Sequence, residues 1–474
     1  MKLEHHFASL GEAFSSETLI QPLLEQRLVE FNQPLAAFLS VDIKSPETKR
    51  ILSGELPQKS SLSMVYAGHQ FGGFSPQLGD GRGVLLGEVY GQDGLLYDLH
   101  MKGAGPTPFS RRGDGRAVLR SCMREYLASE AMTALAVPSS RALALYDSRE
   151  AVYRETPEAG AMLLRTAHGH IRFGHFEYFF YQGKHAELDQ LIDYCLTHYY
   201  PDCLAAELPL VSMLTEVVKR TARLIAKWQA VGFQHGVMNT DNFSFTGETI
   251  DYGPYGFMED YEPNWVCNHS DHEGRYAFSR QPGVGLWNLN CLMRCFSKYL
   301  ERDQLIAILQ CYEPELQSHY DTLMMQKMGL DSVEVMQDLV PDLLTILAAE
   351  KLDYTVFFRL LSHLEANDCE PLLDEVVDRE RLRTWVERYQ AARLAMVDVD
   401  WSQTSFDMLK VNPKFTLRNY LAHEAILAAE RGDYLPFRRL LNVLNSPFEE
   451  HPESNVLAQR APEWGKSLEV SCSS

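Results

Sequence analysis

Apolar residues change their spacing along this chain. Residues 61–115 combine short alternating runs with frequent glycine, a pattern typical of strands joined by tight turns. Spacings of three and four residues dominate in 115–137, in 183–232 and through most of 285–450, and they predict helices. Residues 1–60 mix helical spacing with proline breaks. This order predicts an α+β fold in which a glycine-rich β portion precedes a helix-rich portion.

A glycine-rich loop, Gly79-Asp80-Gly81-Arg82-Gly83, precedes a predicted strand over 84–89. Glycine lets a backbone approach a ligand closely and direct its N–H groups at phosphate oxygens. The loop matches neither common phosphate-loop motif, so an ordinary turn is the alternative interpretation. After a hairpin turn at 92–94, a second strand over 97–102 ends at Lys102, beside the loop.

Lys102 has a predicted partner on the next helix. Asp114 is placed to cap a helix that runs over about 115–135. Glu125 falls in the middle of the apolar stripe of that helix, where a carboxylate needs a partner, and Lys102 is the nearest candidate. A strand lysine paired with a helix glutamate below a glycine loop is how protein kinases hold nucleotide phosphates. Alternatively, Glu125 reaches solvent at the helix edge.

A second set of polar residues follows in His235–Asn242, with the sequence HGVMNTDN. Short strands are predicted over 243–245 and 249–251, around a turn that contains glycine. Pairing Phe245 with Thr249 would place Asn242 and Asp251 at the same end of this ribbon.

The residue types at that end suit a divalent cation. A carboxamide and a carboxylate, Asn242 and Asp251, can bind Mg²⁺, which takes its other ligands from phosphate and water. Asp241 could accept a proton from an attacking hydroxyl. An Asx-rich turn is the alternative. Arg165 and Arg172 carry planar forks suited to phosphate oxygens, but they could also be surface charges.

Basic and acidic side chains are concentrated in two different segments of the chain. Residues 101–124 hold six basic side chains and one acid, whereas 228–274 hold eight acids and no Lys or Arg. The first segment suits anions and the second suits cations. Over all 474 residues, 44 basic against 64 acidic side chains give a net charge of −20. Such a surface repels nucleic acids and anionic lipids, so we expect neither as a partner.

The remaining composition indicates an ordinary globular protein, since 45% of the residues are hydrophobic. The 9 cysteines show no metal-ligand spacing, which favours a reducing compartment. Neither a signal peptide nor a long uncharged apolar run is recognisable. We therefore expect a cytoplasmic protein without membrane spans.

Five strings resemble the selenoprotein O family of protein adenylyltransferases: YAGHQFGGFSPQLGDGRG, DLHMKGAGPTPFSRRGDGRAVLRSCMREYL, HIRFG, GVMNTDN and TIDYGPYGFMEDY. They cover most of 65–275. The resemblance implies a protein-kinase-like, two-lobed fold with a glycine-rich β N-lobe, a helical C-lobe and a helical C-terminal extension. The domains expected are an N-terminal extension (1–60), the N-lobe (61–180), the C-lobe (181–300) and the C-terminal extension (301–474).

The resemblance also implies an activity and a site. AMP would pass from ATP, bound inverted relative to kinases, to Ser, Thr or Tyr hydroxyls of proteins; some bacterial members are described as using UTP with Mn²⁺. Asp241 would accept the proton, Asn242 and Asp251 would hold Mg²⁺ (or Mn²⁺), and Glu125 would pair with Lys102. The nucleotide would contact Gly79, Gly81, Arg82, Lys102, Asp114, Gly115, Arg165, Arg172 and Asp251.

One position departs from ordinary kinases. Counted from His235, the kinase metal-binding Asn is present as Asn242, but the base position is occupied by Val237, which cannot take a proton. Conventional γ-phosphoryl transfer and a non-catalytic nucleotide-binding scaffold remain the alternatives. The family pattern further suggests a redox-sensitive bridge between Cys267 and Cys472, against an inert C-terminal tail.

Overall fold

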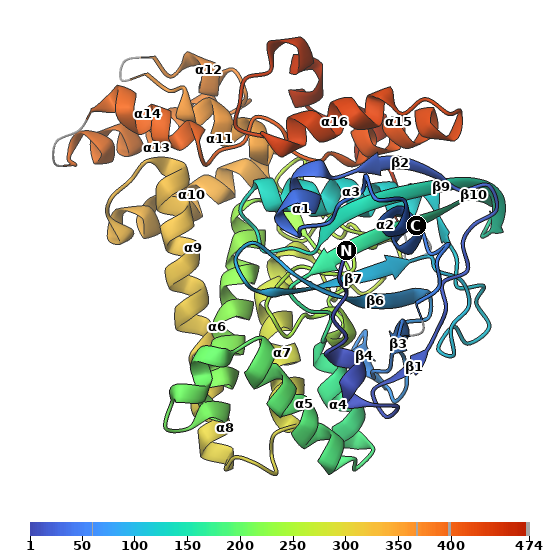
Figure 1. Ribbon diagram of the computed structural model, residues 1–474. Coiled ribbons are helices and arrows are strands. Elements are labelled where there is room, and N and C mark those ends of the chain that lie inside the picture. Colours follow the sequence, from blue (N-terminus) through green and yellow to red (C-terminus); the bar gives the residue numbers. More distant parts are fainter. Residues whose placement is uncertain (59, 366–367, 397–399, 471–474) are drawn as a thin grey trace.

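The computed structural model describes residues 1–58, 60–365, 368–396 and 400–470 (Figure 1). Its main feature is an eight-stranded antiparallel sheet with the order β1-β3-β6-β7-β10-β9-β2, in which β8 also pairs with β10. Both edge strands come from the first sixty residues. The strands are β1 (Ser15–Glu17), β2 (Arg27–Phe31), β3 (Leu62–Met64), β6 (Gly83–Tyr90), β7 (Leu96–Lys102), β8 (Ala117–Val118), β9 (Arg141–Tyr153) and β10 (Pro157–Ala167).

The predicted hairpin is confirmed as β6 and β7, which pair from Gly83 opposite Lys102 to Tyr90 opposite Leu96. The two faces of β7 differ in chemistry. Leu99 and Met101 join a core shared with α1 (Gln33–Phe38) and α2 (Pro46–Leu52). The opposite face carries three buried polar side chains, Asp98, His100 and Lys102. The sheet therefore turns one polar face inward, toward the rest of the molecule.

Helix α3 (Leu119–Ala134) crosses this polar face and begins later than the sequence predicted. Its N-cap is Val118, which ends β8, and no side chain caps it. The expected cap at Asp114 is therefore wrong. The pairing of Ala117 and Val118 with β10 keeps the chain extended, so the helix cannot start until this strand ends. Glu125 is buried in α3, as expected.

Helices below the sheet form the largest core of the molecule, together with α3 (Figure 1). They are α4 (Phe173–Tyr181), α5 (His185–His198), α6 (Pro209–Ala230), α7 (Gln281–Arg294) and α8 (Arg302–Leu309). Two small ribbons are separate from the main sheet: β4 (Gly68–Gln70) with β5 (Gly73–Ser75), and β11 (Phe233–Gln234) with β12 (Gly256–Phe257). Short 3-10 helices span Phe7–Leu10 (η1), Pro201–Ala205 (η2), Thr240–Asn242 (η3), Phe278–Arg280 (η4) and Pro452–Ala458 (η5).

The ribbon predicted over 243–251 is wrong in its register. Phe243, rather than Phe245, pairs with Thr249, and Ser244 pairs with Arg172 instead. The contact with Arg172 draws the first segment toward α4, so only single bridges form.

The C-terminal helices divide between two places. Helices α9 (Tyr312–Met328), α10 (Val333–Glu350), α11 (Tyr354–Ser362), α12 (Glu370–Leu373), α13 (Arg379–Leu394) and α14 (Trp401–Leu409) build a second core, which Met258, Tyr261 and Phe278 join. Helices α15 (Asn419–Glu430) and α16 (Leu435–Asn445) return to α3, where Phe437 meets Tyr126 edge-to-face at 5.7 Å; α17 (Glu463–Lys466) follows. Among the described residues, no helix has both the length and the apolar character needed to cross a membrane.

Candidate active site

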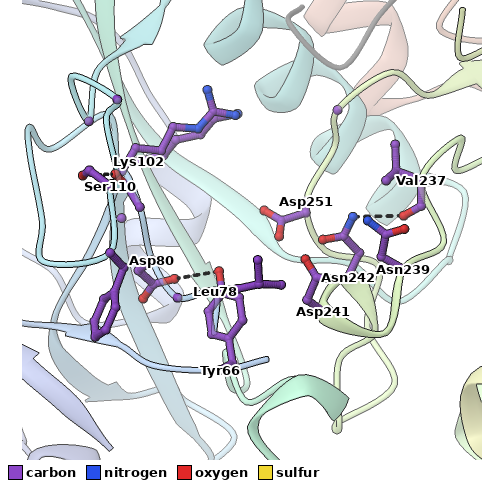
Figure 2. A pocket seen from close by; sticks show the side chains of 18 of the residues that line it. Tyr66, Leu78, Asp80, Lys102, Ser110, Val237, Asn239, Asp241, Asn242 and Asp251 are labelled. Carbon is purple, nitrogen blue, oxygen red and sulfur yellow. Dashed lines mark hydrogen bonds between the residues drawn. The ribbon is translucent and has the colours of Figure 1, made fainter. Parts of the chain in front are cut away.

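A cavity of about 670 Å³ lies between the polar face of the sheet and the loops around β4 and η3 (Figure 2). One wall comes from the loop before β6, the ends of β7 and β10, and the segment after β7. The other wall comes from the β4–β5 turn and from the loops at 237–242 and 251–254. The lining includes these expected site residues: Gly79, Gly81, Arg82, Lys102, Asp114, Gly115, Arg165, Arg172, Asp241, Asn242 and Asp251.

Three buried cations define the deep end of this cavity. Lys102 ends β7, Arg165 lies beside it on β10, and Arg172 precedes α4. Lys102 Nζ pairs with Glu125 Oε2 at 2.5 Å and donates to Ser121 Oγ at 3.1 Å. The predicted Lys102–Glu125 pair is therefore present in the structure.

Glu125 is shared between two of these cations. Its Oε1 accepts from Arg165 Nη1 at 3.0 Å, while its Oε2 contacts Lys102. Burial alone would raise the pKa of Glu125, but the charges of Lys102 and Arg165 hold this pKa below its usual value. A carboxylate that stays ionised in the core keeps both cations fixed at the cavity floor.

The glycine-rich loop is held in place from beneath. Gly79 has φ +124°, and a Cβ there would lie 2.8 Å from the carbonyl oxygen of Met64. Asp80 turns inward, where it accepts from the Met64 N–H at 3.0 Å and contacts His100 Nε2 at 3.1 Å. Arg82 is exposed at the rim. The loop thus combines a backbone fixed by these contacts with one exposed cationic side chain, that of Arg82, which lines the cavity.

Asp114 lies at the rim, where its carboxylate binds Arg154 Nη1 at 2.8 Å and accepts from the Arg116 N–H at 2.9 Å. The adjacent Gly115 is buried with φ +66°, and a Cβ there would lie 2.0 Å from the Gly105 carbonyl oxygen. Only glycine fits at this position, because any side chain would clash with the backbone at Gly105.

Asp241, Asn242 and Asp251 line the opposite wall, and Figure 2 shows their side chains directed into the same part of the cavity. Asn242 donates its Nδ2 to the Val237 carbonyl at 3.0 Å, which leaves its Oδ1 as the atom able to accept or to bind a cation. Asp241 is buried, and burial raises the pKa of its carboxyl to about 7.

Asp251 connects this wall to the cationic end. Its carboxylate binds Arg165 Nη1 at 3.0 Å and is in close contact with Arg172 Nη1. Burial alone would raise the pKa of Asp251, but the charges of Arg172 and Arg165 bring this pKa well below its usual value. The residue has φ +58°, a left-handed conformation that is uncommon outside glycine and concentrates at functional sites.

Sequence reasoning missed several residues of the site. Gln70 Nε2 donates to Asp241 Oδ2 at 3.2 Å, and Asn239 Oδ1 accepts from the Phe71 N–H at 3.1 Å. Tyr66 lies against Arg172, with its ring centre 4.9 Å from the guanidinium carbon. The strings YAGHQFG and GVMNTDN contain all of these residues, but no spacing rule assigns them roles.

Comparison with known proteins decides the family. The sequence model of the family described as protein adenylyltransferase SelO matches residues 1–445. The chain belongs to this family. It is 83% identical to a protein nucleotidyltransferase YdiU of Marinomonas sp. (strain MWYL1) over 474 residues, all of both chains. Over all of this chain it is 48% identical to YdiU proteins of Vibrio cholerae serotype O1 (98% of that protein) and Pseudomonas fluorescens strain SBW25 (99%).

Membership of the SelO family makes the chain a transferase of the nucleotidyltransferase class, which implies a nucleotide and protein substrates. The redox pair predicted for this family member involves Cys472, which lies outside the described residues. Cys267 is buried, and its Sγ donates to the Pro254 carbonyl at 3.0 Å. Pro254 lines the cavity, so Cys267 contacts a residue of the site through this hydrogen bond.

Proposed function

We propose that the chain transfers AMP from ATP to Ser, Thr or Tyr hydroxyls of proteins and releases pyrophosphate. The observation that carries this proposal is the set of charged groups that line one cavity. Three buried cations lie at its deep end, Asp241 and Asn242 lie on the opposite wall, and Asp251 links the two through its contacts with Arg165 and Arg172. Val237 stands where a kinase would have its base, so a hydroxyl that attacked the γ-phosphate would have no proton acceptor in the usual place.

In this proposal the nucleotide lies with its phosphate tail inward. Lys102, Arg165 and Arg172 bind the β- and γ-phosphates, and the glycine-rich loop covers them, as in a protein-kinase-like fold. The phosphate oxygens take over guanidinium contacts that Asp251 makes in the structure. Pyrophosphate is then the stabilised leaving group, and the α-phosphorus faces the acceptor hydroxyl.

A divalent cation fits the opposite wall. Asn242 presents its free Oδ1, and Asp251 presents a carboxylate whose pKa keeps it ionised. These two residues would hold Mg²⁺ or Mn²⁺, which neutralises phosphate charge when it is bound. Asp241, beside Asn242, accepts the proton of the attacking hydroxyl while the bond from the α-phosphorus to the bridging oxygen breaks.

Position-specific labels test the proposal. Incubation with Mg²⁺ and ATP labelled at the α-phosphate should label proteins of a cell lysate or the chain itself, whereas ATP labelled at the γ-phosphate should not. Label from the γ-phosphate would establish a conventional kinase instead. Nucleotide binding without either label would indicate a scaffold. Parallel reactions with α-labelled UTP and with Mn²⁺ determine which donor and cation are preferred.

A further inference from the structure

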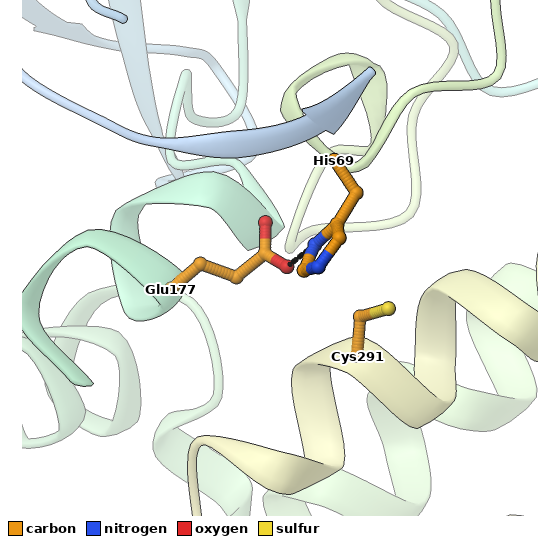
Figure 3. Close-up of side chains that lie close together, drawn as sticks. All are labelled: His69, Glu177 and Cys291. Atoms are coloured by element: carbon orange, nitrogen blue, oxygen red, sulfur yellow. Dashed lines mark hydrogen bonds and ion pairs between the residues drawn. The ribbon is translucent and has the colours of Figure 1, made fainter. Parts of the chain in front are cut away.

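Glu177 lies on α4, behind the wall that carries Asp241, and its side chain is completely buried. Its Oε1 contacts His69 Nδ1 at 2.5 Å, and its Oε2 accepts from the Thr240 hydroxyl at 2.5 Å. The Thr240 oxygen in turn accepts from the backbone N–H of His69 at 2.7 Å. These contacts close a hydrogen-bonded ring that joins α4, β4 and η3; Figure 3 shows its His69–Glu177 side.

The chain neighbours of this ring form the immediate surroundings of Asp241. Asp241 follows Thr240 directly. Gln70, which follows His69, donates to Asp241 Oδ2 at 3.2 Å. Gly68, which precedes His69, lies so close that a Cβ there would be 2.6 Å from Asp241 Oδ1. A shift of the ring would therefore move both sides of the Asp241 carboxylate.

Helix α4 gives the ring a rigid base. Gly174 lies one turn before Glu177, and its carbonyl accepts from the Ala67 N–H at 2.9 Å. A Cβ at Gly174 would lie 2.0 Å from the Ala67 carbonyl oxygen and 3.5 Å from the Asp241 Cα. The same face of α4 thus fixes the start of β4 and packs against the Asp241 backbone.

We propose that Glu177 is a positioning residue for the proton acceptor Asp241, acting through Thr240 and His69. The inference rests on the proposed AMP transfer, in which Asp241 must meet the acceptor hydroxyl at a defined distance. Among the described residues, no Lys or Arg forms an ion pair with Glu177. A buried carboxylate held by a hydroxyl and an imidazole fixes orientation more than it adds charge.

A metal ion is the competing use of this place. His69, Glu177 and Cys291 bring donor atoms within 4.8 Å of one another (Figure 3). The direct His69–Glu177 contact favours the hydrogen-bonded ring. Burial, together with the charge of Glu177, raises the pKa of the Cys291 thiol to about 12, so in the metal-free protein this thiol keeps its proton.

Threonine variants test the positioning role. Thr240→Val keeps the side-chain shape and removes the hydroxyl that links Glu177 to His69. We expect kcat for AMP incorporation to fall about 10- to 100-fold, because a small misplacement of a reacting group is costly. The KM for ATP should stay within about two-fold, since other residues hold the phosphates. Thr240→Ser, which retains the hydroxyl, should recover most of kcat.

The outcomes separate the possibilities. Unchanged kcat in Thr240→Val, or a serine variant no better than valine in a protein of unchanged melting temperature, would overturn the inference. A stoichiometric metal in the purified protein that is lost in Cys291→Ser would also overturn it, in favour of a metal site. If the wild-type chain transfers no AMP, the proposed function fails and this inference fails with it; an active wild type with an unaffected valine variant refutes the inference alone.

Discussion

Two helical glutamates lie behind opposite walls of the cavity and are held in different ways. Glu125 on α3 contacts Lys102 and Arg165, two permanent cations. Glu177 on α4 contacts a hydroxyl and an imidazole. Both carboxylates are buried, so neither is stabilised by contact with solvent. The difference indicates that the deep end is organised around charge. The wall that carries Asp241, which we call the acceptor end, is organised around the position of one carboxylate.

Charge at the deep end forms a continuous chain. Lys102, Glu125, Arg165, Asp251 and Arg172 follow one another through direct contacts with alternating sign. Removal of one member takes a charge partner away from each of its neighbours, and leaves an end member such as Lys102 buried without an ion pair, which costs more than the pair itself contributes. Among the described residues, the acceptor end has no such chain of ion pairs, so we expect changes there to affect turnover before stability.

Loss of Asp251 should have the largest effect on turnover. Asp251→Ala removes a proposed ligand of the cation and the carboxylate that faces Arg165 and Arg172. We expect AMP incorporation to fall by about 10³-fold or more, as for removal of a central electrostatic group. Initial rates with α-labelled ATP, over a range of Mg²⁺ concentrations, measure the loss. Turnover near the wild-type value would contradict the cation assignment.

The two glutamates can be compared directly by amide substitution. Glu125→Gln leaves Lys102 and Arg165 with less negative charge, and we expect it to lower the free energy of unfolding by about 3–5 kcal/mol. Glu177→Gln preserves the shape of the side chain, and the residues that contact it, His69 and Thr240, are neither Lys nor Arg. We expect this variant to lower the free energy of unfolding by about 1–3 kcal/mol. Urea unfolding of both variants gives the two values. Equal losses would show that the two sites do not differ in kind.

How far the sequence predicts this molecule depends on whether a feature is local. The β6–β7 hairpin and the face of β7 that carries Lys102 follow from glycine turns and alternation, and the pair with Glu125 follows from helical spacing. The start of α3 was missed because Val118 is held in β8 by β10, a partner about forty residues away.

The acceptor end shows the same limit of prediction from the sequence. Asp241, Asn242 and Asp251 were found as a cluster, although the pairing proposed for the strands around them was wrong. The contact of Ser244 with Arg172 changed that pairing, and no local pattern announces it. Gln70 and Glu177 reach Asp241 and Thr240 from 171 and 63 positions away in the chain. Tertiary packing alone brings such residues together.

Gly68→Ala should have a smaller effect, confined to the acceptor end. Its Cβ would lie 2.6 Å from Asp241 Oδ1, so the carboxylate must move. We expect kcat to fall about 10-fold while the KM for ATP changes little. Gly73→Ala is the matched control in the same ribbon, because its Cβ would meet only the Gln70 carbonyl oxygen at an ordinary 3.5 Å. Equal rates for the two variants would separate Gly68 from the chemistry.

The smallest effect on stability is expected at an exposed carboxylate, that of Asp114. Asp114 is 44% exposed, and its partner Arg154 is 22% exposed, so solvent already screens the pair. Since α3 is fixed by β8 rather than by an Asp114 cap, Asp114→Ala should lower the free energy of unfolding by less than about 1 kcal/mol. Arg154→Ala, which breaks the same pair from the other side, should cost a similar amount. A loss as large as that of Glu125→Gln would mean that the rim supports the fold as strongly as the buried charges do.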